Sequence, residues 1–268
     1  MIKISVLTDE VYQPIGRALD FIETYMAPVR HVELRGVSID KEDKKGVADL
    51  DRPDLAKVKE ILEERGFGVS SVSSGFGKYK RTSWEDGEEW KLQQALLERA
   101  LEASTLLGAP YTRCFGFRRV EGVPLENCLE TIAERLGWAA DLAQEHDVVL
   151  ALETEGGLYA DTAENTRRIL DAVNSRYLRV NYDVGNSFAV GDRVWPDGFH
   201  LLKDYMVFMH VKSMRTPLGK KIDYLNIFRE LKRMEFDGFL SNEHHTRGGA
   251  PAALELHQDI LRLFDRIY

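Results

Sequence analysis

Three carboxylates and one imidazole close four successive apolar stretches in the second half of the sequence. These residues are Glu153, Asp183, His210 and Glu243, and each stands where a short buried strand would end. One alone would fit a salt bridge or a helix cap, but three converging carboxylates would repel one another unless a divalent cation joined them. Oxygen and imidazole donors suit Mn²⁺, Mg²⁺, Co²⁺ or Zn²⁺. The four residues together therefore predict a site for one divalent metal ion.

Basic residues also stand at strand ends, in a chain whose formal net charge is -8. Arg35, Arg113 and Lys212 could each bind a hydroxyl, carboxylate or phosphate group of a substrate, and each could equally form a structural ion pair. Glu33 is expected to pair with Arg35 or Arg113 and to orient it. These three cations are the predicted substrate contacts that rest on the residues alone.

Predicted strands and helices, which must position these residues, alternate along the chain. Eight short apolar stretches are predicted strands: 2–8, 31–36, 67–74, 109–116, 148–157, 178–186, 206–213 and 238–245. Eight stretches with helical spacing of apolar residues follow them: 14–26, 52–66, 88–108, 124–147, 161–173, 196–205, 224–236 and 250–267. Such alternation predicts a parallel sheet, and eight units in roughly 250 residues match the size of a (β/α)8 barrel. An open doubly wound sheet is the rival, but it normally has fewer strands.

The predicted fold is therefore an α/β TIM barrel that forms a single domain over residues 1–268. In a TIM barrel the carboxyl ends of the strands form the active site, so the polar strand ends should meet at one rim. His244 directly follows Glu243, and the alternation of side chains along a strand should turn it away from the pore.

Composition disfavours several classes of partner. The acidic balance repels phosphate backbones, so nucleic acid is a poor partner, and no run of 18 apolar residues exists to span a membrane. The first residues, MIKISVLTDE, begin as a strand and do not have the pattern of a signal peptide. Cys114 and Cys128 have no metal-type or redox-type spacing, which is typical of a reduced compartment. These observations predict a cytoplasmic protein.

The sequence resembles the xylose isomerase-like TIM barrels, the sugar-phosphate isomerase/epimerase group, over essentially its whole length. The resemblance rests on five motifs: HVELRG (31–36), LALET (150–154), NYDVGN (181–186), HVKS (210–213) and SNEHH (241–245). It implies that Glu153, Asp183, His210 and Glu243 bind one divalent metal, and that Glu153 and Glu243 are the acid/base pair. It also implies a sugar or sugar phosphate as the substrate. Members of the group are often dimers or tetramers, which is compatible with a homo-oligomer here, although no stretch marks an interface.

Two positions depart from the pattern of the ketose 3-epimerases in this group. These enzymes often carry a histidine three residues after the aspartate, where this sequence has Asn186, and an arginine six residues after the metal-binding histidine, where Thr216 follows Arg215. Asn186 and Arg215 are accordingly predicted substrate contacts. Endonucleases of the group need extra histidines that SSVSS, YTRCF and DVGN do not supply, so a nuclease is disfavoured.

The predicted reaction is proton transfer through an enediolate. One carboxylate removes the proton next to a carbonyl, and a second carboxylate on the opposite face returns it with inverted configuration, which is epimerisation. One carboxylate acting alone between neighbouring carbons gives aldose-ketose isomerisation, and catalysis of this kind contributes about 10²–10⁴-fold. The alternative is a dehydratase or lyase of a polyhydroxy ketone, of the inosose or dehydroshikimate type, in which loss of a β-hydroxyl follows the same proton abstraction. A barrel that only binds a sugar is a further alternative.

Overall fold

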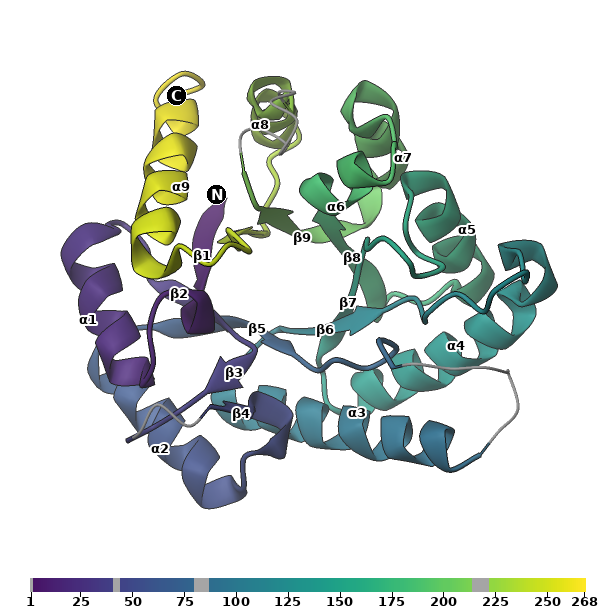
Figure 1. The fold of residues 1–268 in the computed structure, drawn as a ribbon, viewed down its shortest axis with the longest axis horizontal. Helices are drawn as coiled ribbons and strands as arrows, with labels where there is room; N and C mark the ends of the chain where they lie inside the picture. Colours follow the sequence, from purple (N-terminus) through teal and green to yellow (C-terminus); the bar gives the residue numbers. More distant parts are fainter. Residues whose placement is uncertain (1, 41–43, 80–86, 214–221) are drawn as a thin grey trace.

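Eight parallel strands pair in chain order around a closed barrel in the computed structural model (Figure 1). The structure describes residues 2–40, 44–79, 87–213 and 222–268. The barrel strands are β1 (Lys3–Leu7), β2 (His31–Leu34), β5 (Gly68–Ser73), β6 (Tyr111–Phe115), β7 (Val149–Glu153), β8 (Leu178–Asp183), β9 (Met206–Val211) and β10 (Phe239–Asn242). The last strand, β10, pairs with the first, β1, and closes the barrel. The predicted (β/α)8 fold is confirmed.

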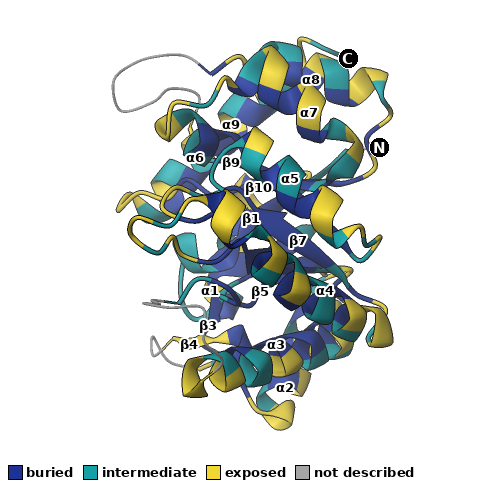
Figure 2. Ribbon diagram, turned by 90° about the vertical axis from the view of Figure 1, so that its right-hand side faces the viewer, coloured by how far each residue is buried: buried dark blue, intermediate teal, exposed yellow. Residues whose placement is uncertain are grey.

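Helices surround the strands in Figure 1, and the last helix lies beside the first. They are α1 (Ile15–Tyr25), α2 (Arg52–Glu64), α3 (Glu88–Leu107), α4 (Leu129–Glu145), α5 (Ala163–Val173), α6 (Val184–Ala189), α7 (Phe199–Leu202), α8 (Tyr224–Arg233) and α9 (Gly249–Phe264). Each long helix buries one apolar face against the strands and exposes the other, as Figure 2 shows. Local signals set their ends: Asp51 caps α2, and Gly108 ends α3 in a left-handed conformation. Among the described residues, no helix has the length and apolarity that crossing a bilayer requires.

Three local features differ from the predicted elements. The predicted helix over 196–205 is broken into a π-helical turn (Val194–Gly198), α7 and a 3-10 turn (Lys203–Tyr205), because proline and glycine interrupt it. The predicted strand over 178–186 ends at Asp183, since the Asp183 side chain caps α6. A small antiparallel pair, β3 (Gly36–Val37) and β4 (Lys45–Gly46), follows β2 and was not predicted.

The barrel interior changes from apolar to polar along its axis. Phe208, Phe239 and Ala151 form a small apolar cluster, with Tyr111 packed against it. Two residues further along β9 and β10, His210 and Ser241 are neighbours in register. Because side chains alternate between the two faces of a strand, the residues that follow on the inner face continue this polar layer toward the carboxyl rim. The interior is thus built to hold charged groups at that end.

Candidate active site

The four predicted metal ligands converge in the barrel. One ligand atom from each of Glu153, Asp183, His210 and Glu243 lies within 4.8 Å of the ligand atoms of the other three. The His210 Nδ1 atom is the common centre, at 3.0 Å from Glu243 Oε2, 3.4 Å from Glu153 Oε1 and 3.6 Å from Asp183 Oδ2. The four residues are no more than 2% exposed. Sequence reasoning thus placed all four residues correctly in one cluster.

The donor set fits a divalent metal ion. Three buried oxygens, Glu153 Oε2, Asp183 Oδ2 and Glu243 Oε2, accept no hydrogen bond from the residues that the structure describes. Each lies close to a cationic nitrogen, but not in hydrogen-bonding geometry. Three buried carboxylate oxygens that accept no hydrogen bond from the described residues, together with one imidazole nitrogen, form a ligand set suited to a hard or borderline cation.

Asp183 is held by both of its neighbouring elements. Its backbone N–H donates to Thr154 Oγ1, 3.0 Å away at the end of β7, and its Oδ1 atom accepts from the backbone N–H of Asn186 at 2.8 Å. Its Oδ2 atom is left to point at His210 and Lys212. One carboxylate therefore starts α6 and presents an oxygen to the cluster.

Two of the predicted cations lie inside the cluster. Arg113 Nη1 lies 3.0 Å from Glu153 Oε2 and 3.3 Å from Glu243 Oε1, while Ser73 Oγ accepts from its Nε and Nη2 atoms. Lys212 Nζ lies 2.9 Å from Asp183 Oδ2 and donates to Asn186 Oδ1 at 2.9 Å. Arg113 therefore touches both predicted acid/base residues, and Lys212 touches the third carboxylate.

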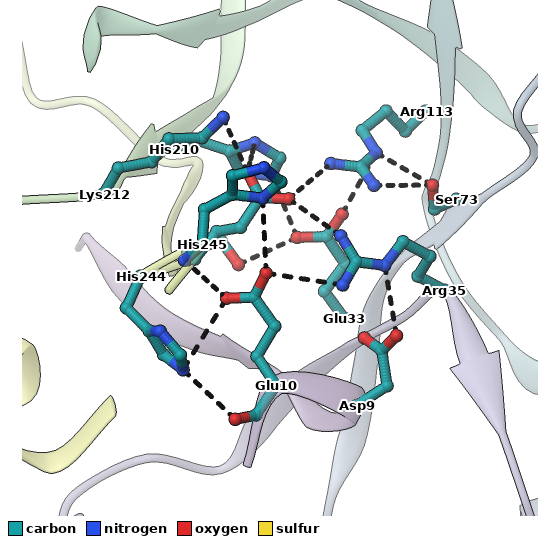
Figure 3. Close-up of polar contacts among 12 residues, drawn as sticks. Asp9, Glu10, Glu33, Arg35, Ser73, Arg113, His210, Lys212, His244 and His245 are labelled. Carbon is teal, nitrogen blue, oxygen red and sulfur yellow. Dashed lines mark hydrogen bonds and ion pairs between the residues drawn. The ribbon is translucent and has the colours of Figure 1, made fainter. Parts of the chain in front are cut away.

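Arg35 lies at the outer edge of the cluster in Figure 3. It contacts Glu243 Oε1 at 3.3 Å, Asp9 Oδ2 at 3.1 Å and Glu10 Oε1 at 3.3 Å. Sequence reasoning missed Asp9 and Glu10, although the polar run Thr8-Asp9-Glu10 directly after the first strand was the available signal. A second group of side chains that could hold a metal ion consists of Glu10, Glu243 and His245. It includes two of the carboxylates that Arg35 contacts, those of Glu10 and Glu243. Arg35 already neutralises that group, so it has less need of a cation.

Glu33 faces both an arginine and a predicted metal ligand. Its Oε1 atom lies 3.4 Å from Arg113 Nε, as expected from the sequence, and its Oε2 atom lies 2.9 Å from His210 Nε2, which the sequence did not suggest. The other expected partner, Arg35, pairs with Asp9, Glu10 and Glu243 instead.

His244 lies outside the cluster of predicted metal ligands. Its Nε2 atom is 3.1 Å from the Glu10 carbonyl oxygen, and its Nδ1 atom accepts from the Thr246 backbone N–H at 3.0 Å. The ring thus joins the end of β10 to the turn after β1. This agrees with the prediction that it turns away from the ligands.

Burial and charge oppose each other at the carboxylates. Burial raises their pKa values, but His210 and Arg113 outweigh it and hold the pKa of Glu243 well below its usual range. Lys212 and His210 lower the pKa of Asp183 in the same way, against the effect of burial. Burial lowers the pKa of Lys212, but the carboxylates around it, Asp183 first, raise it overall. Asp183 and Glu243 are therefore ionised at neutral pH, as ligands and bases must be.

A pocket of about 320 Å³ opens over the cluster. Its lining includes these predicted site residues: Arg35, Arg113, Glu153, Asn186, Lys212 and Glu243. Asn186 stands on the first turn of α6, where its side-chain amide donates to Glu153 Oε1 at 3.3 Å. Arg215 lies outside the described residues. The volume suits a small molecule rather than a polymer.

Glu243 is more deeply buried than a residue on an exposed barrel rim would be. Although it follows the last barrel strand, it is 2% exposed and faces Arg35, Arg113 and Lys212. Removing its charge would leave buried cations with fewer partners, which costs stability.

Comparisons with known proteins place the chain among the barrels suggested by its motifs. The family model described as xylose isomerase-like TIM barrel matches residues 27–265. The putative L-ribulose-5-phosphate 3-epimerase SgbU of Escherichia coli is 21% identical over 238 residues, covering 83% of this chain and 82% of that protein.

Two solved structures share the fold. A D-tagatose 3-epimerase-like protein aligns with a TM-score of 0.79 at 14% identity, covering 99% of this chain and 98% of that one. The probable 3-DHS dehydratase AsbF of Bacillus anthracis aligns with a TM-score of 0.77 at 14% identity, covering 97% and 99%. At these identities the structural matches concern the fold alone.

Proposed function

We propose that this chain, which belongs to the xylose isomerase-like TIM barrel family, is an isomerase-type enzyme that moves a proton on a small sugar or sugar phosphate with Glu153 and Glu243 as the two bases. One observation carries the proposal. Two buried carboxylates from β7 and from the end of β10 face the same His210 Nδ1 atom and the same Arg113 Nη1 atom at the base of the pocket.

Glu153, Asp183, His210 and Glu243 would hold the divalent cation that the donor set fits. When bound, Mn²⁺, Mg²⁺, Co²⁺ or Zn²⁺ supplies positive charge beside the substrate oxygens, where negative charge develops as the proton leaves.

The bases themselves belong to the chain. An ionised glutamate removes the proton next to the substrate carbonyl and becomes a neutral acid, and the electron pair moves onto the carbonyl oxygen as an enediolate. If the second glutamate holds a proton taken from solvent and delivers it to the opposite face, the product is the epimer, and the two glutamates then exchange protons with solvent to return to their starting forms. If the first glutamate returns the proton to the neighbouring carbon, the product is the aldose or ketose isomer. Arg113 Nη1 contacts both glutamates, so it is placed to hold the two carboxyl groups in position during transfer.

Lys212 and Arg35 are placed to hold the substrate. Both line the pocket, and each keeps part of its side chain accessible, 16% for Lys212 and 34% for Arg35. Lys212→Met and Arg35→Met should each raise KM about 10- to 100-fold, the range for a lost hydrogen bond to a charged group, and should change kcat less. Steady-state kinetics on a turned-over substrate measure this. Lys203→Met is the matched control, since Lys203 pairs with Glu230 away from the pocket. Unchanged KM in both variants would make the two residues structural ion pairs.

The function is tested by proton exchange with solvent. The metal-loaded chain is incubated in D₂O with a panel of ketoses and their phosphates, and the substrates are followed by NMR. Deuterium should enter at the carbon next to the carbonyl of a true substrate, together with an epimer or an isomer. Loss of water with appearance of an absorbing enone would instead identify the dehydratase alternative, which begins with the same proton removal. Binding of a sugar with neither exchange nor conversion across the panel would contradict an enzyme of either kind.

A further inference from the structure

A third glutamate, Glu33, contacts the cluster of predicted metal ligands on the side away from the other carboxylates. Glu33 on β2 is fully buried, and its Oε2 atom lies 2.9 Å from His210 Nε2. The predicted metal-binding carboxylates all face the other ring nitrogen, Nδ1. Glu33 is therefore outside the predicted ligand set but in direct contact with one of its members, His210; both side chains are labelled in Figure 3.

The hydrogen bonds at Glu33 Oε2 fix which ring nitrogen of His210 carries the proton. Ser241 Oγ donates to this same oxygen at 2.8 Å. An ionised carboxylate only accepts hydrogen bonds, so the contact requires a proton on His210 Nε2. When the ring is neutral, Nδ1 then has no proton and presents its lone pair to Glu153, Asp183 and Glu243. Asn181 Nδ2 lies 3.3 Å from both ring nitrogens and does not distinguish them.

The other oxygen of Glu33 reaches the residue that contacts both bases. Glu33 Oε1 lies 3.4 Å from Arg113 Nε, and the Nη1 atom of the same guanidinium faces Glu153 and Glu243. Glu33 thus joins His210 to Arg113 across the barrel interior. A glutamine could serve only one of these partners, because its amide NH₂ would face a donor at the other.

We infer that Glu33 is a positioning residue that keeps His210 Nδ1 free to bind a metal ion and holds Arg113 against the two bases. The inference rests on the proposed function for its metal ion, but the contact between Glu33 and His210 can be measured independently of it. Groups that hydrogen-bond to a metal-binding histidine commonly contribute 10- to 100-fold to metal affinity.

The first test is metal affinity, measured with Zn²⁺ against a competing chelator. Glu33→Gln should bind Zn²⁺ about 10- to 100-fold more weakly than the wild-type chain. Ser241→Ala, which removes one hydrogen bond from the same Glu33 oxygen, should weaken binding about 2- to 10-fold, and it serves if Glu33→Gln does not fold. Ser5→Ala is the matched control, because Ser5 is a neighbour of Ser241 in register and its hydroxyl pairs with Ser70 instead. Its affinity should equal that of the wild-type chain.

The second test reads the His210 ring directly by ¹H–¹⁵N NMR of protein labelled with ¹⁵N-histidine, with His210→Gln to assign the signals. The wild-type chain should show a low-field Nε2–H proton, as a carboxylate partner produces, and Glu33→Gln should shift it upfield. Unchanged Zn²⁺ affinity in Glu33→Gln and Ser241→Ala, or an Nε2–H signal that does not respond to Glu33→Gln, would overturn the inference. A wild-type chain that binds no divalent metal would instead overturn the metal-dependent function, and the metal-free NMR signal would still decide the role of Glu33.

Discussion

Replacing Glu243 with glutamine should reduce turnover of a true substrate by about 10²–10⁴-fold, the contribution of a positioned general base. Glutamine keeps the shape of the side chain but can neither take up the substrate proton nor carry the charge that Arg113 Nη1 faces at 3.3 Å. The measurement is kcat/KM with the metal supplied in excess, so that weaker metal binding does not mimic a lost base. Normal turnover by Glu243→Gln would remove this residue from the mechanism.

Glu153→Gln makes the experiment more decisive, because the two proposed reactions differ in how many bases they need. In an epimerisation with one base on each face, each variant should lose conversion but still exchange the proton of one epimer with D₂O. In an isomerisation with a single base, one variant should lose exchange completely and the other should keep it. The pattern of deuterium uptake in the pair of variants therefore assigns the reaction type.

Folding must be checked beside activity. Glu243 is buried among cations, so its loss is expected to cost stability as well. Glu126→Gln is a matched control, since Glu126 forms an ion pair with Arg168 on the outside of the barrel. Thermal unfolding of the three variants separates a lost base from a lost fold: turnover should fall far more than the population of folded protein does.

Much of the site could be predicted because a parallel barrel turns positions along the chain into positions in space. Glu153 is the last residue of β7 and His210 the second-last of β9, and alternation along each strand directs both to the interior. Since all strands run in one direction, their carboxyl ends share one rim. The spacing of apolar stretches was therefore enough to predict that Glu153, Asp183, His210 and Glu243 lie together.

Contacts across the pore could not be predicted in this way. Glu33 lies on β2, whose neighbours are β1 and β5, whereas His210 lies on β9, between β8 and β10. The periodicity of apolar residues does not predict which side chains contact each other across the interior, because those contacts depend on the radius of the barrel and the stagger of its strands. The same limit applies to Arg35, which forms ion pairs with Asp9 and Glu10 rather than with its near neighbour Glu33.

The boundary at Asp183 illustrates a different limit. An apolar run that continues through Val184 reads as one strand, but the Asp183 side chain accepts from the Asn186 backbone N–H and starts a helix there. A single hydrogen bond at the strand end thus decided where Asn186 lies. As a result, Asn186 donates to Glu153 and accepts from Lys212 on the first turn of α6.

Asp183→Asn should weaken divalent metal binding by more than about 100-fold, because loss of a ligand removes more than loss of a group that merely hydrogen-bonds to one. Asparagine is as good a helix cap as aspartate, so α6 should keep its start, which Asp183→Ala would weaken by about 1 kcal/mol. The substitution changes the Oδ2 atom, which lies 2.9 Å from Lys212 Nζ and 3.6 Å from His210 Nδ1. In asparagine, an amide NH₂ group or a neutral carbonyl oxygen would replace this anionic oxygen.

The same substitution at Asp51 provides the matched control, since Asp51 caps α2 with a 2.8 Å hydrogen bond and lies away from the pocket. Metal content after extensive dialysis, followed by titration with Mn²⁺ and Zn²⁺, should give one tightly bound ion per wild-type chain and per Asp51→Asn chain. Asp183→Asn should retain the fold by circular dichroism but hold the ion only at high metal concentration. If Asp183→Asn binds as tightly as the wild-type chain, the ion is not held by these four residues. The buried oxygens of Glu153, Asp183 and Glu243 would then be balanced by Arg113, Lys212 and a protonated His210 alone, since the carboxylates around His210 already raise its pKa well above the usual value against the effect of burial.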